Sequence, residues 1–323
     1  MAISLSIFSF DNAYILMYIE MKRLIVSFFV ILAGVFVVDR IGGLLMGWVN
    51  RHTSDITAPK IKYLVNDVDE EVLFMGTSRC NFHYVPSIIS DSLGMSVYNG
   101  GIDASDNIFA HYWVLNQVLS HHTPKMICLE VMDNDYVIQS TPFNTISFFA
   151  PYYGCNERAD SIFRLAGTHW AYEVSHLYRY NAKAVSNLAG LLVNRQSNED
   201  HGYLPGPKPA RFPEVLEYDE TRTDVDSLKL AYLRKFILLC EDRDIRLVFM
   251  VSPRYSQVGM DKYDVLKAVA TEHGIPFFDY YTRGLFLDHP EYFKDVAHLW
   301  DKGARVYSAI FAHDLKEWLE KAL

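Results

Sequence analysis

The sequence lacks clusters of positive charge. Its 323 residues include 30 Lys and Arg against 39 Asp and Glu, which gives a formal net charge of −9 at pH 7. Lys and Arg never occur in a run longer than two residues. Proteins that bind nucleic acid usually carry a basic patch or stripe, so the composition argues against nucleic acid as a partner.

Cysteine is scarce, and no metal-binding pattern is present. The four cysteines are Cys80, Cys128, Cys155 and Cys240. No pair among them has the spacing of a zinc or redox motif, and we expect small buried side chains. Glu173 and His176 have the spacing of a metal pair on a helix, but no second pair accompanies them. The sequence predicts neither a metal nor any other cofactor.

The longest apolar run lies near the N-terminus. Residues 24–38 carry no charge, residues 39–40 (Asp-Arg) interrupt the run, and residues 41–49 are apolar again. A bilayer span needs about 20 residues, and the first run approaches that length only together with the second. We predict an uncleaved signal anchor over residues 21–49. The alternative is a buried core helix in a cytosolic enzyme.

The charges before the apolar run predict its orientation. Lys22 and Arg23 precede it, and positive charges mark the cytoplasmic side of a span. We therefore expect a single-pass membrane protein whose body is extracytoplasmic, in the periplasm or at the cell exterior. Residues 1–20 stand before what reads as a normal start at Met21, so we expect a misassigned or disordered extension there.

The body alternates between short apolar runs and amphipathic stretches. Residues 50–70 read as a polar linker that leads into a domain over 71–323. Predicted strands are 72–75, 96–98, 126–132, 247–251 and 276–280. Predicted helices are 85–93, 105–120, 228–241, 262–272 and 303–319. This alternation predicts a parallel α/β sheet that is covered by helices on both faces.

Residues 136–225 depart from the alternation. They contain an aromatic-rich segment, a helical stretch over 157–193 and a Pro/Gly-rich stretch over 204–213. We predict an insertion between the third and fourth strands. Two interpretations stay open, a segment that packs over the sheet and shapes a substrate groove, and a mere structural elaboration. The aromatic residues of 147–153 are expected in the core, with stacking on sugar rings as the alternative.

A candidate nucleophile follows the first strand. Gly76-Thr77-Ser78 stands at the strand end, and Asp295 and His298 lie before the last helix. Ligands of parallel sheets bind beyond the carboxyl ends of the strands, so the topology predicts that these segments meet. His298 can take the proton of the Ser78 hydroxyl, and Asp295 can orient the imidazole.

Other polar groups near the strand ends complete the candidate site. An oxyanion needs hydrogen-bond donors. The candidates are the backbone N–H groups of Ser78, Gly100 and Gly101 and the side-chain amides of Asn99 and Asn134. Arg79 is a candidate contact to a substrate group, with a structural ion pair as the alternative. His83 is an alternative local partner of the serine.

These motifs resemble the SGNH/GDSL-type serine hydrolases. The resemblance rests on Gly76-Thr77-Ser78, the glycines after the second strand and Asp295-x-x-His298, and it covers about 71–135 and 228–320. It implies a flavodoxin-like three-layer α/β/α sandwich with a mainly parallel five-stranded sheet. It also implies Ser78 as nucleophile with His298 and Asp295 as its partners. Thr77 replaces the usual aspartate of that motif.

The Gly-Thr-Ser-Arg form and the anchor resemble the exported branch of that superfamily, which handles acyl groups of polysaccharides and the cell envelope. The resemblance implies a serine esterase or O-acyltransferase that acts on acyl groups, in the first place acetyl groups, of a glycan or envelope polymer. A membrane acyltransferase is a candidate partner. The alternative is a catalytically silent SGNH-like domain that binds a glycan or supports such an acyltransferase.

Overall fold

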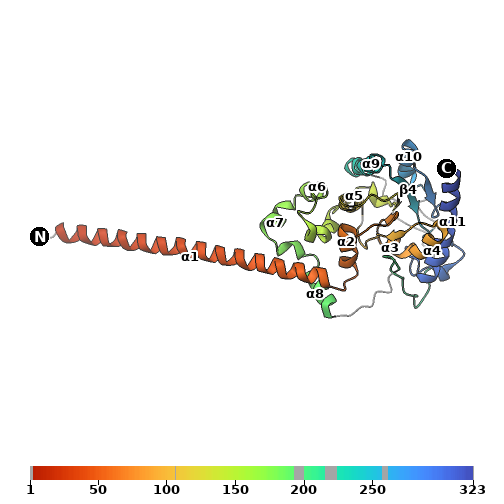
Figure 1. Cartoon of the computed structure of the whole chain (residues 1–323). Coiled ribbons are helices and arrows are strands. Elements are labelled where there is room, and N and C mark those ends of the chain that lie inside the picture. Colours follow the sequence, from red (N-terminus) through yellow and green to blue (C-terminus); the bar gives the residue numbers. More distant parts are fainter. Residues whose placement is uncertain (1–2, 106, 193–199, 215–223, 257–260, 323) are drawn as a thin grey trace.

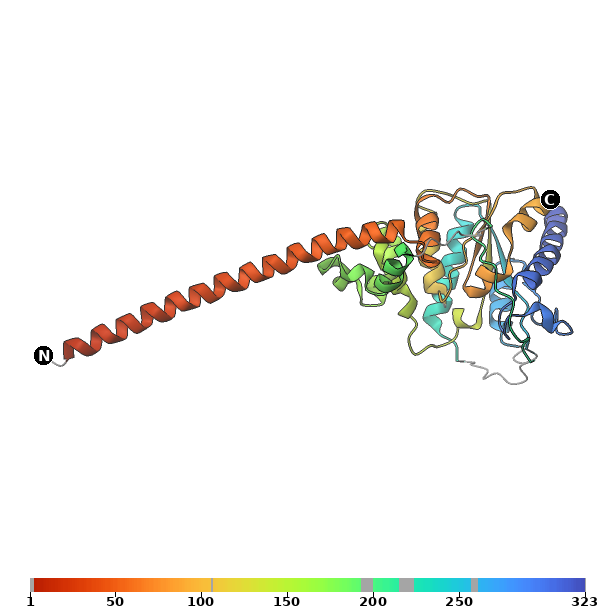
Figure 2. The same cartoon turned by 90° about the horizontal axis from the view of Figure 1, so that it is seen from below.

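The structure consists of a long N-terminal helix and an α/β body (Figures 1 and 2). This computed structural model describes residues 3–105, 107–192, 200–214, 224–256 and 261–322. The body holds a parallel five-stranded sheet in the order β2-β1-β3-β4-β5. The strands are β1 (Val72–Met75), β2 (Val97–Asn99), β3 (Met126–Glu130), β4 (Arg246–Val251) and β5 (Phe277–Asp279). This is the flavodoxin-like order, with the chain reversing direction across the sheet between β1 and β3.

Helices cover both faces of the sheet, because successive side chains of each strand point to opposite faces. On β1, Leu73 and Met75 belong to one core cluster, and Val72 and Phe74 belong to the other. The first cluster is covered by α2 (Thr57–Asn66), α5 (Ile108–Val118), α9 (Ser227–Glu241) and α10 (Asp264–Glu272). The second is covered by α3 (Ser78–His83), α4 (Pro86–Leu93) and α11 (Asp301–Ala322). The predicted three-layer fold is confirmed.

Residues 50–70 do not form the predicted linker. Residues 57–66 are helix α2, which packs against α5. Ile61 and Leu64 of α2 are buried in the core cluster that contains Leu73. The composition of this stretch is typical of a linker because its buried residues occupy only one side of a short, otherwise polar helix. The domain therefore includes this segment.

The predicted insertion contains several short helices. They are η2 (Asn144–Tyr152), α6 (Glu157–Leu165), α7 (His169–Val174), η3 (Tyr178–Tyr180) and α8 (Ala184–Leu192), and η1 (Asp133–Asp135) lies directly before the insertion. α6 and η2 pack on α5 on the outside of the sheet, whereas α8 and η3 contact the N-terminal helix (Figure 1). These helices are an elaboration beside the sheet. Residues 193–199 and 215–223 of the insertion lie outside the described residues.

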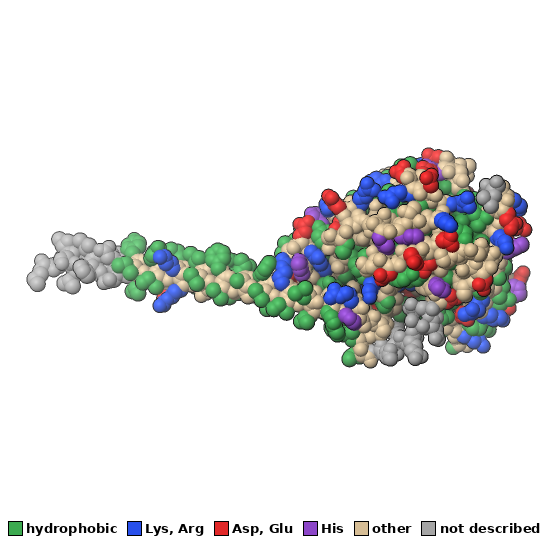
Figure 3. Space-filling view, viewed as in Figure 1, with side chains coloured by type: hydrophobic (Ala, Val, Ile, Leu, Met, Phe, Trp, Pro, Cys, Tyr) green, Lys and Arg blue, Asp and Glu red, His purple; other side chains and the backbone are tan. Residues whose placement is uncertain are grey.

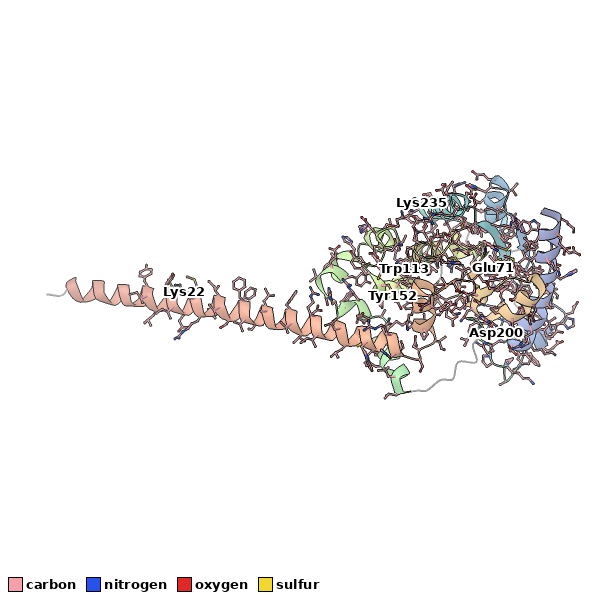
Figure 4. The ribbon with its side chains drawn as sticks, in the orientation of Figure 1. Lys22, Glu71, Trp113, Tyr152, Asp200 and Lys235 are labelled. Atoms are coloured by element: carbon pink, nitrogen blue, oxygen red, sulfur yellow. The ribbon has the colours of Figure 1, made fainter. Side chains whose placement is uncertain are left out.

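The aromatic segment of the insertion belongs to the core. Phe149 is fully buried and stacks on Trp113 of α5, with ring centroids 4.3 Å apart. Tyr152 also lies beside Trp113 and is partly buried against the core (Figure 4). The core interpretation of this segment is confirmed.

The chain from residue 200 onward returns to the carboxyl edge of the sheet. The N–H of Leu204 donates to the carbonyl of Asn81 in α3 (3.2 Å), and the carbonyl of Gly206 accepts from Asp301 N–H (3.0 Å). This part of the insertion therefore borders the segments that carry the candidate nucleophile and its base.

The N-terminal helix α1 (Ile3–His52) is continuous. Its part Tyr14–His52 is long and apolar enough to cross a membrane, and the most apolar window of that part has a mean hydropathy of 2.4 with no buried residue. Lys22 lies on the part of α1 that extends away from the body (Figure 4). The helix is a candidate membrane anchor or signal sequence. Residues 3–20, for which we expected a misassigned or disordered extension, continue the same helix.

We predict that α2 contributes to the stability of the body. Leu64 has 1% of its surface exposed, and a Leu64→Ala substitution should lower the free energy of unfolding by about 2–5 kcal/mol through lost burial and a residual cavity. Asn66→Ala, on the exposed side of the same helix, is the matched control and should change it by less than about 0.5 kcal/mol. Urea unfolding of the full-length chain in detergent, followed by tryptophan fluorescence, measures both. Equal stability of the two variants would contradict a core role for α2.

Candidate active site

The candidate nucleophile stands at a tight turn between β1 and α3. Gly76 has a φ of 154°, and an added Cβ there would lie 2.7 Å from Cys80 Cβ and 2.8 Å from Glu130 Cβ. Only glycine fits this position without a shift of its neighbours. Helix α3 then begins at Ser78, which is half-buried, while Thr77 is buried. The hydroxyl of Ser78 thus lies at the carboxyl edge of the sheet, beside the switch between β1 and β3.

The candidate base and its carboxylate lie in the loop between η4 (Pro290–Tyr292) and α11. Asp295 Oδ1 accepts hydrogen bonds from the N–H groups of Ala297 and His298, both at 2.9 Å. The same carboxylate faces His298 Nδ1 at 2.9 and 3.1 Å. The Asp-x-x-His spacing therefore forms a closed turn, in which the aspartate orients the ring of the histidine three residues later.

Ser78, His298 and Asp295 form one hydrogen-bonded series. Ser78 Oγ lies 2.8 Å from His298 Nε2, although 220 residues separate them in the chain. Because Nδ1 faces the carboxylate, it carries the proton, which leaves Nε2 free to accept the proton of the serine hydroxyl. The arrangement has the geometry of a nucleophile, a general base and an orienting carboxylate.

The surroundings of Asp295 keep it ionised. Partial burial favours the neutral acid, but the hydrogen bond and charge of His298 and the two backbone N–H donors outweigh it. Together they lower the pKa of Asp295 to about 2. The carboxylate is therefore charged at neutral pH and can stabilise a positively charged imidazole.

The buried carboxylate of Glu130 stabilises the turn that carries Ser78, because it pairs with Arg79, the next residue. Glu130, the last residue of β3, is fully buried and forms an ion pair with Arg79 Nη2 at 3.3 Å. It also accepts hydrogen bonds from the hydroxyl of Tyr84 and from Ser252 N–H (3.0 Å) and Oγ–H (2.7 Å). Burial raises the pKa of Glu130, while Arg79 and these donors act in the opposite direction. The sequence indicates a buried carboxylate here, because Glu130 is an acidic residue at the end of an otherwise apolar strand.

The burial of Arg79 argues against the contact with a substrate group that we predicted for it. Only 2% of its surface is exposed, and its guanidinium donates to the carbonyl of Val131 (3.3 Å) as well as pairing with Glu130. A buried guanidinium next to a buried carboxylate is a structural ion pair, the alternative that we had kept for this residue.

His83 belongs to the same buried network. Its Nε2 accepts the N–H of Leu299 (2.9 Å), and its Nδ1–H donates to Ser252 Oγ (2.7 Å). Burial, with smaller contributions from the charges of His298 and Arg79, lowers the pKa of His83 well below its ordinary range. The neutral ring therefore ties α3 to the residue that follows the candidate base. This is a different role from the local partner of Ser78 that we had kept as an alternative.

Three of the candidate oxyanion donors are occupied. Gly100 N–H donates to Phe74 O (2.9 Å), and Gly101 N–H donates to Asn99 Oδ1 (3.0 Å). The amide of Asn99 donates to the carbonyls of Cys80 and Tyr84, both at 2.7 Å. These bonds complete the sheet edge and fasten α3, so the prediction that these groups serve as oxyanion donors is wrong for this conformation.

Two candidate donors remain, the N–H of Ser78 and the side chain of Asn134. Ser78 begins α3, where N–H groups have no acceptor within the helix. Asn134 is half-buried in η1, directly after β3. Thr77 Oγ1 donates to Met132 Sδ at 3.1 Å, so the segment that leads to Asn134 lies against the nucleophile turn. Both groups stay predictions as oxyanion donors.

No group of three or more His, Cys, Asp or Glu side chains that could hold a metal occurs within the residues that the structure describes. Glu173 and His176 therefore stand without further ligands in the described part of the chain. Glu173 instead accepts a hydrogen bond from the hydroxyl of Tyr153 at 2.7 Å.

Comparisons with known proteins give similarity in structure only. No protein-family model matches the sequence, and no curated protein matches it. A lipolytic-type protein of the G-D-S-L family from Desulfitobacterium hafniense is similar, with 11% identity, a TM-score of 0.38, and coverage of 75% of this chain and 97% of that chain. A protein described as a platelet activating factor from Streptococcus pneumoniae is similar, with 13% identity, a TM-score of 0.39, and coverage of 85% and 96%.

Proposed function

We propose that this protein is a serine esterase or O-acyltransferase that works through an acyl-enzyme on Ser78. The observation that supports the proposal is the hydrogen-bonded series from Ser78 through His298 to Asp295. The separation of 2.8 Å between Ser78 Oγ and His298 Nε2 lies within the reach that general-base catalysis requires. Ser78 is half-buried, not enclosed in the core.

The reaction follows from these positions. Ser78 Oγ attacks the carbonyl carbon of an ester while its proton moves to His298 Nε2. The C–O bond to the leaving alcohol then breaks, and His298 returns the proton to that alcohol. Water or an acceptor hydroxyl, deprotonated by His298, attacks the acyl-enzyme and regenerates Ser78. Asp295 holds the imidazole and balances its charge in both steps.

The oxyanion of each tetrahedral intermediate needs donors near Ser78. We assign this role to the N–H of Ser78, at the positive end of α3, and to the amide of Asn134 beside the same turn. An oxyanion donor is worth about 3–4 kcal/mol of transition-state stabilisation in mutational tests. The Asn134 amide therefore has a large effect on rate in this proposal.

The proposed substrate is an O-acyl group, in the first place acetyl, of a glycan or envelope polymer. Two features support it. The charges of Lys22 and Arg23 before the apolar part of α1 favour an extracytoplasmic body. Ser78 is half-buried at the edge of the sheet, and a serine in that position suits an acyl group on a large polymer better than a serine inside a closed pocket would. A membrane acyltransferase remains the candidate partner.

A second function, a catalytically silent domain that binds a glycan or supports an acyltransferase, is favoured by one observation. The N–H groups of Gly100 and Gly101 and the amide of Asn99 are bonded elsewhere, which reduces the number of oxyanion donors. A fluorophosphonate probe separates the two functions, because a silent domain should not react at Ser78.

We predict that Ser78→Ala abolishes ester turnover. Loss of a triad nucleophile lowers kcat by about 10⁴-fold or more, so hydrolysis of p-nitrophenyl acetate by the full-length variant should fall to the background rate. Fluorophosphonate labelling should disappear with it. Ser227→Ala, an exposed serine at the start of α9, is the matched control and should keep both. Unchanged turnover or labelling in Ser78→Ala would refute the serine mechanism.

We predict a pH dependence in which Asp295 does not take part near neutrality. Its lowered pKa, about 2, means that its interaction with His298 is present at neutral pH and is lost only as the pH falls towards that value. The pH–rate profile should therefore show no loss of activity from protonation of Asp295 until the pH approaches that value.

Asp295→Asn should lower kcat by about 10³- to 10⁴-fold, because the ring loses its orienting partner and its compensating charge. Asp288→Asn, at an exposed aspartate just before η4, is the control and should leave kcat unchanged. Steady-state kinetics across pH measure both. An Asp295→Asn variant with parental kcat would exclude Asp295 from the mechanism.

A further inference from the structure

The insertion carries an exposed apolar surface that the proposed chemistry does not use. It consists of Trp170 and Val174 on α7, Leu177 in the turn before η3, and Val185, Leu188 and Leu192 on α8, and we call it the apolar platform. Trp170 is 62% exposed, Val185 83% and Leu192 88%. Large apolar side chains gathered on one surface mark a contact with a partner or a membrane.

The platform residues share helix faces. Trp170 and Val174 are four residues apart on α7, and Val185, Leu188 and Leu192 recur at spacings of three and four on α8. Residues at these spacings lie on one side of a helix. Each helix therefore buries its opposite side in the protein and presents an apolar face outward.

The platform is fastened to α1 by a polar cluster within the apolar helix. Asp39 accepts hydrogen bonds from the hydroxyl of Ser175 and from the N–H groups of His176 (2.9 Å) and Leu177 (3.2 Å). Arg40 pairs with Asp39 at 2.9 Å and donates to the carbonyl of Val174 at 3.3 Å. The insertion thus supplies hydrogen-bond partners to Asp39 and Arg40, the two charged residues that interrupt the apolar sequence.

Glycines of α1 allow this close approach. A Cβ on Gly43 would lie 2.6 Å from His176 Cβ, and one on Gly47 would lie 2.9 Å from the Tyr180 hydroxyl. The face of α1 that turns away from the insertion stays apolar and exposed, as at Leu44 (73%) and Trp48 (51%). In Figure 3 the hydrophobic surface of α1 reaches the adjoining end of the body, where Lys, Arg and His side chains lie among the hydrophobic ones.

The level of the platform follows from the length of a membrane span. Lys22 and Arg23 mark one boundary, and about 20 residues of helix cross the hydrocarbon core. Counted from Leu24, the span ends close to Gly43, where the insertion packs on α1. The turn around His176, with α7 directly before it, therefore lies at the level of the opposite membrane surface, whereas α8 meets α1 about two to three turns further out, at Asn50 and Thr53. Tryptophan is enriched at that level of membrane proteins, which suits Trp170 and Trp48.

We propose that the part of the apolar platform on α7 and the turn that follows it is a membrane-binding surface, whose side chains enter the outer part of the bilayer next to α1. An open crevice of about 390 Å³ between α1 and the platform, lined by residues such as Met46, Leu177, Tyr178 and Ala184, gives room for part of a lipid acyl chain. The inference rests on the membrane-anchor part of the proposed function and is independent of the chemistry at Ser78.

Tryptophan quenching by brominated phospholipids tests the platform. The full-length protein is placed in vesicles of brominated phosphatidylcholine that contain no other protein, and its emission is compared with that in unbrominated vesicles. Trp170→Phe should remove roughly half of the quenchable emission, because Trp170 and Trp48 are the two tryptophans at the membrane level. Trp318→Phe, in α11 on the far side of the body from α1, is the matched control and should leave it unchanged (Figure 1).

A third variant separates the platform from the anchor. Trp48→Phe should also reduce quenching, because Trp48 reports on α1 itself. If Trp48→Phe reduces quenching and Trp170→Phe does not, membrane binding by the platform is refuted, while membrane insertion of α1 is supported. If neither variant changes quenching, both are overturned. Ester hydrolysis by Trp170→Phe should equal that of the parent, so a failure of the catalytic proposal is recognised separately.

Discussion

The buried carboxylate of Glu130 is the group on which the arrangement at the carboxyl edge of the sheet depends. An ionised carboxylate without partners in the interior costs several kcal/mol, so its donors must be in place when the body folds. Those donors come from Tyr84 after α3, from Ser252 after β4 and from Arg79 beside the nucleophile. The interactions that satisfy Glu130 therefore also hold the turn that presents Ser78.

The network extends from Glu130 to the loop of the base. Ser252 Oγ accepts a hydrogen bond from His83 Nδ1–H. His83 Nε2 in turn accepts one from the N–H of Leu299, which directly follows His298. Ser78 and His298 are far apart in sequence, but both are fastened to one buried group of polar side chains. Their hydrogen bond is thus a property of the folded body and does not depend on a bound ligand to bring the two together.

The sequence predicted those features that local patterns encode. Apolar runs such as 72–75 located all five strands, and Asp295-x-x-His298 located a turn because three residues suffice to close it. The sequence did not predict contacts that depend on distant segments. Arg79 looked accessible because Glu130 lies on another strand, and the N–H groups of Gly100 and Gly101 looked available because their acceptors come from tertiary packing. Helix α2 was missed because its buried stripe is short.

The unbroken course of α1 into the body has a consequence for how the protein meets its substrate. An enzyme on a flexible tether sweeps through a volume and reaches targets at many distances from its anchor. Here the helix is continuous to His52, and the hydrogen bond that Asp39 accepts from His176 N–H holds it against the body. With α1 in a bilayer, Ser78 keeps a constant height above the lipid. Only groups carried at that height, by a bending polymer or by a neighbour in the same membrane, come within its reach.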